Sequence, residues 1–102
     1  MATSRKFVPP VAFHPGNTLS AKLEEMGMGV KEFAVRTSKP EKTISAVISG
    51  KSSVTSDMAV AFESVTKIPA HFWLNKQRAF DEFVARQKRE EQLVLAYKWV
   101  RM

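Results

Sequence analysis

The sequence contains no cysteine, only two histidines and no long apolar run. The absence of cysteine excludes a disulfide scaffold and a cysteine-based zinc site, and it is consistent with a reducing cytoplasm. No apolar run approaches the roughly 18–20 residues of a membrane span. The opening stretch MATSRKFVPPVAFHPG also lacks the apolar segment of a signal peptide. These absences predict a cytoplasmic protein with no membrane partner.

Residue patterns that carry out catalysis are missing as well. His14 and His71 lie far apart, and neither has a second potential ligand nearby. The sequence has no glycine-rich phosphate loop, no nucleophile motif and no cluster of Asp, Glu and His at metal-ligand spacing. We therefore predict no catalytic residue, no metal site, no cofactor and no enzymatic activity.

The positive charge of the chain limits the choice of partner. With 102 residues, of which 44% are hydrophobic, the chain suits one domain with a modest core. Its net charge of +6 favours a polyanionic partner such as nucleic acid, an anionic membrane or an acidic protein surface. A soluble surface with an excess of lysine would give the same charge, so the charge does not identify the partner.

Apolar residues at helical spacing, bounded by prolines and glycines, predict an all-α chain of five helices with short links. We expect these helices at about 15–26, at 29–36, from Pro40 to the stop at Gly50, after the N-cap Thr55, and from Pro69 onward. Two prolines in the first ten residues rule out a regular helix there, so an irregular arm is expected at 1–13. The final stretch LVLAYKWV fits a continued fifth helix or a short strand.

The second and third predicted helices match the helix-turn-helix requirement. They are joined by the three-residue link Thr37-Ser38-Lys39. Ala34 is small enough for the close helix crossing, and Ile44 and Val47 would fill the wedge behind it. The third helix would then present small and polar residues, which suits the roughly 12 Å major groove of DNA. Short helical hairpins are common, however, and most of them do not bind DNA.

Four stretches in a fixed order carry a family resemblance: HPGNTLSAKLEEMGM, KEFAVRT…KTISAVISGK, VTSDMAVAFE and IPAHFWLNKQRAFD. Together they resemble the HigA/VapI antitoxins, a branch of the Xre/Cro-type helix-turn-helix proteins. The resemblance implies a five-helix lambda-repressor-like domain at 14–81 and a C-terminal helical extension at 82–102. It also implies a homodimer that binds operator DNA in its own promoter and neutralises a HigB-type mRNA-cleaving toxin.

The helical pattern and this resemblance together suggest roles for individual residues. Base edges would be read by Glu41, Lys42, Ser45 and Ala46. Phosphates would be held by Lys31, Lys39, Thr43, Ser49, Lys51 and Ser52. A dimer or partner interface would use Phe80, Phe83, Val84, Leu93, Tyr97 and Val100.

Four positions depart from the family pattern. Val30 replaces a glutamine that commonly donates to a phosphate, and Ser38 replaces a turn glycine. Pro40 and Glu41 replace polar or basic residues at the tip of the recognition helix, where a glutamate repels phosphate unless it meets a cytosine amine. An alternative therefore stays open: a helical protein-interaction module whose operator reading is weak or lost.

Overall fold

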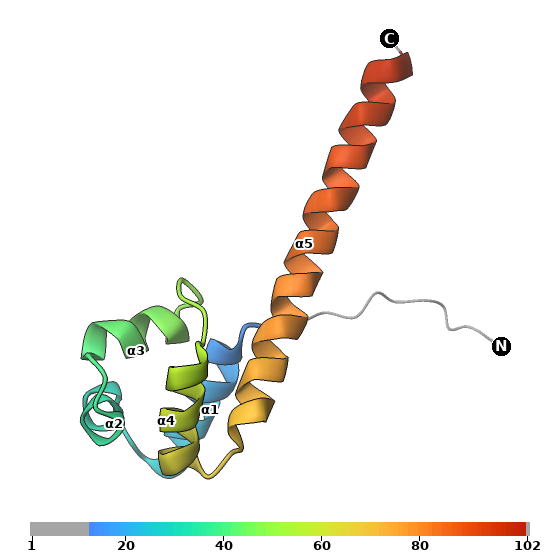
Figure 1. Ribbon diagram of the computed structural model, residues 1–102. Helices are drawn as coiled ribbons and strands as arrows, with labels where there is room; N and C mark the ends of the chain where they lie inside the picture. Colours follow the sequence, from blue (N-terminus) through green and yellow to red (C-terminus); the bar gives the residue numbers. More distant parts are fainter. Residues whose placement is uncertain (1–12, 102) are drawn as a thin grey trace, which may run out of the picture.

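The computed structural model describes residues 13–101, which form five α-helices (Figure 1). They are α1 (Pro15–Met26), α2 (Val30–Thr37), α3 (Glu41–Ile48), α4 (Ser56–Thr66) and α5 (Ala70–Arg101). The predicted all-α fold with five helices is therefore confirmed. The predicted arm at 1–13 lies outside the described residues except for Phe13, whose side chain is exposed.

Local chemistry sets the helix ends. The Nδ1 atom of His14 accepts a hydrogen bond from the Gly16 N–H at 3.0 Å and so caps the start of α1. Gly27 ends the same helix in the left-handed conformation, with φ 65°. The Thr55 hydroxyl accepts from the Met58 N–H and caps α4. These three ends agree with the sequence prediction.

The start of α3 differs from the prediction. Pro40 was expected in the first turn, but its ψ of 142° is extended, so it caps the helix from outside. Its carbonyl oxygen accepts the first helical hydrogen bonds, from Thr43 and Ile44. The helix begins at Glu41, and the link from α2 therefore consists of residues 38–40.

The core draws side chains from all five helices. Three aromatic rings form its centre, with Phe33 5.3 Å from Phe62 and Phe62 5.4 Å from Trp73 between centroids. All three side chains are fully buried, and each such burial contributes roughly 1.5–3 kcal/mol. The other core side chains are Leu19, Leu23, Ala34, Ile44, Val47, Val54, Met58 and Ala59.

The first turn of α1 packs directly against the last turn of α3. A Cβ atom added to Gly16 would lie 2.0 Å from the carbonyl oxygen of Val47 and 2.9 Å from that of Ile48. The adjacent ring of His14 contacts Phe80 of α5 edge to face, with centroids 5.0 Å apart. Three helices therefore meet at this point and hold α3 in position.

Helix α5 runs without interruption for 32 residues and extends beyond the other helices (Figure 1). The polar run at 87–92 continues the helix because it consists of good helix formers. The strand considered for LVLAYKWV is therefore wrong. The apolar side chains of this stretch are exposed, so it does not fold back on its own domain. Within residues 13–101, no helix has the length and hydropathy needed to cross a bilayer.

Candidate nucleic-acid interface

The turn between α2 and α3 has a defined geometry. Ser38 adopts the left-handed conformation, with φ 57°. The Lys39 N–H donates to the Ala34 carbonyl at 3.0 Å, and the Ser38 N–H donates to the Val35 carbonyl at 3.2 Å. In helix ends with these two hydrogen bonds, the residue in the left-handed conformation is usually glycine. A serine in this conformation has a backbone strain of about 1 kcal/mol. The turn sets the direction in which α3 leaves α2.

The residues expected to pack this two-helix unit all lie inside. Ile44 and Val47 are fully buried, and Ala34 is 4% exposed. Because these side chains take up the inner face of the unit, the opposite face of α3 is left to solvent.

The exposed face of α3 brings three of the four predicted base-reading residues together. Glu41, Lys42 and Ser45 are exposed, whereas Ala46 is half-buried. Glu41 lies in the first turn, where a carboxylate is favoured by the helix dipole by roughly 0.3–1 kcal/mol. The glutamate at the N-terminus of α3 therefore stabilises the helix, whether or not it contacts a base.

The residues predicted to hold phosphates differ in their exposure and in the bonds they already make. Lys31 and Lys51 are exposed, and like Lys42 they make no ion pair within the described part of the chain. Thr43 and Ser52 are half-buried. The Ser49 hydroxyl donates to the Ala46 carbonyl at 3.1 Å. Because a hydroxyl has one proton, Ser49 can donate to a phosphate only by giving up that bond.

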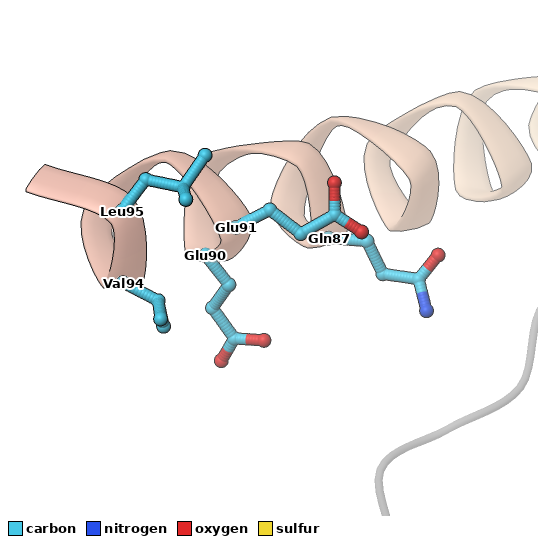
Figure 2. A pocket seen from close by; sticks show the side chains of 5 residues that line it. All are labelled: Gln87, Glu90, Glu91, Val94 and Leu95. Carbon is cyan, nitrogen blue, oxygen red and sulfur yellow. The ribbon is translucent and has the colours of Figure 1, made fainter. Parts of the chain in front are cut away.

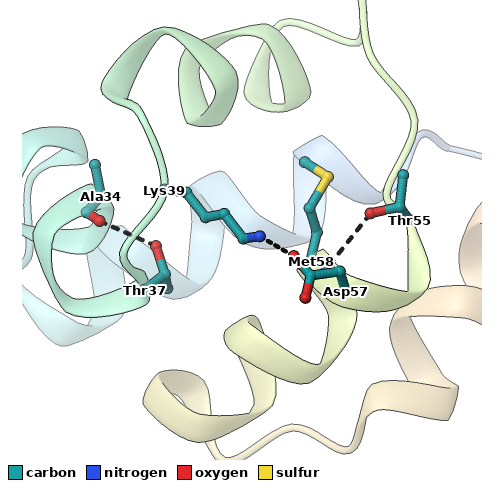
Figure 3. Close-up of polar contacts among 6 residues, drawn as sticks. All are labelled: Ala34, Thr37, Lys39, Thr55, Asp57 and Met58. Atoms are coloured by element: carbon teal, nitrogen blue, oxygen red, sulfur yellow. Dashed lines mark hydrogen bonds and ion pairs between the residues drawn. The ribbon is translucent and has the colours of Figure 1, made fainter.

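Lys39 differs from the other lysines of this group because its amine forms an ion pair with Asp57 of α4 (Figure 3). This contact is not among those predicted from the sequence. Asp57 lies in the first turn of α4, and its partner is 18 positions away in the chain. No sequence signal specifies such a pair.

Val30 lies at the start of α2, where a phosphate donor is usual in the family that the sequence resembles. Its side chain is half-buried and packs against the hydrophobic core. This position contributes to folding instead of presenting a hydrogen-bond donor to the solvent.

The predicted interface residues of α5 fall into two groups. Phe80 and Phe83 are half-buried, and Phe80 contacts His14 of its own chain, so Phe80 is partly used in packing the domain. The other four are exposed: Val84, Leu93, Tyr97 and Val100. Figure 2 shows five neighbouring side chains that project from α5 and line an open hollow on its surface: Gln87, Glu90, Glu91, Val94 and Leu95.

Candidate metal ligands do not gather anywhere in residues 13–101, where no group of three His, Asp or Glu residues could hold an ion. The buried wedge, the tight turn and the exposed polar face of α3 instead define a helix-turn-helix protein.

Comparison with known proteins specifies the family. No family model matches the sequence. YddM, an uncharacterized HTH-type transcriptional regulator of Escherichia coli, is 30% identical over 66 residues, covering 65% of this chain and 70% of YddM. The structure of a HigA-family addiction module antidote protein from Coxiella burnetii superposes with a TM-score of 0.77 at 27% identity, covering 82% of this chain and 92% of that one. The chain belongs to the family of HTH-type transcriptional regulators and is similar in structure to a HigA-family antidote protein.

A second solved structure shares the fold. Pseudomonas aeruginosa HigA, solved with the higBA promoter, superposes with a TM-score of 0.76 at 21% identity, covering 81% of this chain and 91% of that one. At this identity the likeness concerns the fold, and it confirms the arrangement of the helices around α3.

Proposed function

We propose that this protein is an antitoxin that represses its own operon by placing α3 in the major groove of operator DNA. One observation carries the proposal: Glu41, Lys42 and Ser45 form an exposed polar face on a helix whose other side is buried by Ile44 and Val47. A helix presented in this way can enter the groove with its N-terminal residues at the base edges. The relation to a HigA-family antidote and the promoter-bound structure of the same fold support it.

Charges around α3 suit contacts to the DNA backbone. Lys31, Lys42 and Lys51 are exposed and make no ion pair within the described residues. In this proposal Lys31 and Lys51 hold phosphates on either side of the helix, which sets register without sequence information. Lys42 is then the residue that donates to a base.

The experiment is a titration of duplex DNA from the region upstream of the gene, at two salt concentrations and against a scrambled duplex of equal length. Tight binding to one site with a steep salt dependence supports operator reading. The variant Lys42→Ala should weaken operator binding by about 1–3 kcal/mol and relax base preference if the lysine makes a bidentate contact. If neither affinity nor preference changes in this variant, Lys42 is not a base reader.

We further propose that the protein acts as a homodimer whose recognition helices lie about 34 Å apart, one turn of DNA. The exposed apolar side chains at 93–100 support an assembly, because contiguous apolar patches usually mark interfaces. Light scattering of the full chain and of a chain ending at Gln92 tests this. A monomeric full chain, or a truncated chain that still forms the same dimer, contradicts the role of this stretch.

The toxin partner in this proposal is a HigB-type mRNA-cleaving protein. The family relation supports an antidote role, and the apolar side chains on α5 are available to a protein partner. Co-expression with a candidate toxin should restore growth of the host cells. Growth arrest that persists despite soluble antitoxin would contradict this pairing.

A protein-interaction module that no longer reads an operator is the second candidate. Three observations favour it: Glu41 is exposed at the helix tip, Val30 is used for core packing, and the amine of Lys39 is paired. The same titration separates the two candidates, since this module would bind both duplexes weakly and without preference.

A further inference from the structure

Lys39 and Asp57 form an ion pair that joins the helix-turn-helix turn to the start of α4 (Figure 3). Hydrogen bonds fix the backbone at both ends: the Lys39 N–H donates to the Ala34 carbonyl, and the Thr55 hydroxyl accepts from the Met58 N–H at the start of α4. The two other ion pairs of the described residues, Lys22–Glu25 and Arg36–Glu32, each lie within one helix. The Lys39–Asp57 pair therefore depends on tertiary structure rather than on helical spacing.

The pair changes the charge of the surface beside α3. Sequence alone shows five positive residues near the helix-turn-helix unit, Lys31, Arg36, Lys39, Lys42 and Lys51, against Glu32 and Glu41. In the folded chain Asp57 also lies on this surface, and two of the five cations form ion pairs. The Arg36 Nη2 atom lies 2.9 Å from the Glu32 Oε2 atom, and the Lys39 amine pairs with Asp57. Three lysines remain for phosphate.

Lys39 lies two residues before the first residue of α3, at the end of the recognition helix that faces DNA in the proposed function. We propose that Asp57 lowers operator affinity by holding the Lys39 amine away from the DNA backbone. This inference rests on the proposed function. It identifies Asp57 as an affinity-determining residue that does not itself contact DNA.

The magnitude of the effect follows from exposure and counterion release. The Asp57 side chain is 79% exposed but that of Lys39 is only 22% exposed, so solvent screens the pair only in part and Asp57 can compete with a phosphate for the amine. A lysine that neutralises a phosphate releases a counterion, which steepens the salt dependence by about 0.9 in log–log slope. Freeing Lys39 should therefore tighten binding by roughly threefold to tenfold at 50 mM salt, for each half-site.

The experiment measures operator duplex binding by the full chain and by Asp57→Asn between about 50 and 200 mM salt. We expect tighter binding and a slope steeper by about 0.9 per half-site in the variant. Glu25→Gln is the matched control, since it removes the same charge and breaks the 3.6 Å exposed pair with Lys22 at the far end of α1 from α3. The control should change neither affinity nor slope.

A double-mutant cycle tests whether Lys39 carries the gain. Lys39→Gln should change affinity less than about twofold in the native background, because its charge is already engaged. In the Asp57→Asn background the same substitution should abolish the gain. Thermal melting of each variant shows whether the fold is retained.

Three outcomes would overturn the inference. They are unchanged or weaker binding by Asp57→Asn, a gain that survives Lys39→Gln, and a gain equal to that of Glu25→Gln. If the native chain binds the operator duplex with preference but the variants behave in one of these ways, the inference alone fails. If the native chain binds neither duplex, the proposed function fails together with it.

Discussion

The contact between α1 and α3 supports a quantitative prediction for Gly16→Ala. The added Cβ atom would lie 2.0 Å from the carbonyl oxygen of Val47 and 3.0 Å from the Cα of Ile48. Both are backbone atoms, so a change of rotamer cannot relieve the clash. The two helices must separate by at least about 1 Å to reach the 3.0 Å below which such contacts essentially never occur.

The energetic cost can be estimated from the core side chains of α3. A gap of 0.5–1 Å loses about a quarter to a half of the dispersion energy of the affected contacts. Ile44 and Val47 are fully buried, and each contributes roughly 1.5–3 kcal/mol by burial. The substitution therefore loses part of the burial energy of these two side chains and adds overpacking strain of about 1–3 kcal/mol. After the better helix propensity of alanine is subtracted, the free energy of unfolding should fall by about 3 kcal/mol.

Urea unfolding and thermal unfolding, each followed by circular dichroism at fixed protein concentration, measure this change. A loss of about 3 kcal/mol should lower Tm by roughly 10–25 °C for a domain of this size. Gly29→Ala is the matched control, since nothing lies within 4 Å of the added atom and the backbone there is extended. It should cost less than about 1 kcal/mol. If Gly16→Ala also costs less than about 1 kcal/mol, the two helices are not in rigid contact and this reasoning is refuted.

Three further predictions concern single contacts. Ser38→Gly should raise the free energy of unfolding by about 0.5–1 kcal/mol, because it relieves the left-handed conformation at φ 57°; an unchanged urea midpoint would contradict this. Gln77→Leu should cost about 1–3 kcal/mol, because the buried Val54 N–H, now 2.8 Å from the Gln77 Oε1, would lose its acceptor; protease sensitivity of the loop before α4 should rise in parallel. His14→Ala should cost about 1–2 kcal/mol through the lost cap and the lost contact with Phe80, and a Tm equal to that of the native chain would show that neither matters.

Much of the fold was predictable because the signals that start and end helices are local. A proline in the first turn, a glycine past the last residue and a threonine cap act through atoms a few positions away. Pro15, Gly27 and Thr55 therefore indicated helix ends that the structure confirms. The periodic placement of Ile44 and Val47 likewise indicated which face of α3 is buried.

The local reading was less accurate where two conformations satisfy the same residue. Pro40 suits both the first helical position and the position before it, and only its ψ angle decides between them. The stretch at 93–100 is apolar enough for a strand or a helix. It is helical because it continues α5 from a segment already packed on α4 and α1.

The sequence by itself determined the number of helices, the helix-turn-helix unit and the family resemblance, because these depend on residue order and short-range spacing. Tertiary structure alone decided that Asp57 engages Lys39, that Phe80 covers His14 and that Gly16 meets the backbone of Val47. Each of these contacts joins residues far apart in the chain, and their side chains meet only after the helices pack. The charge presented beside α3 is consequently a property of the folded protein and cannot be counted from the sequence.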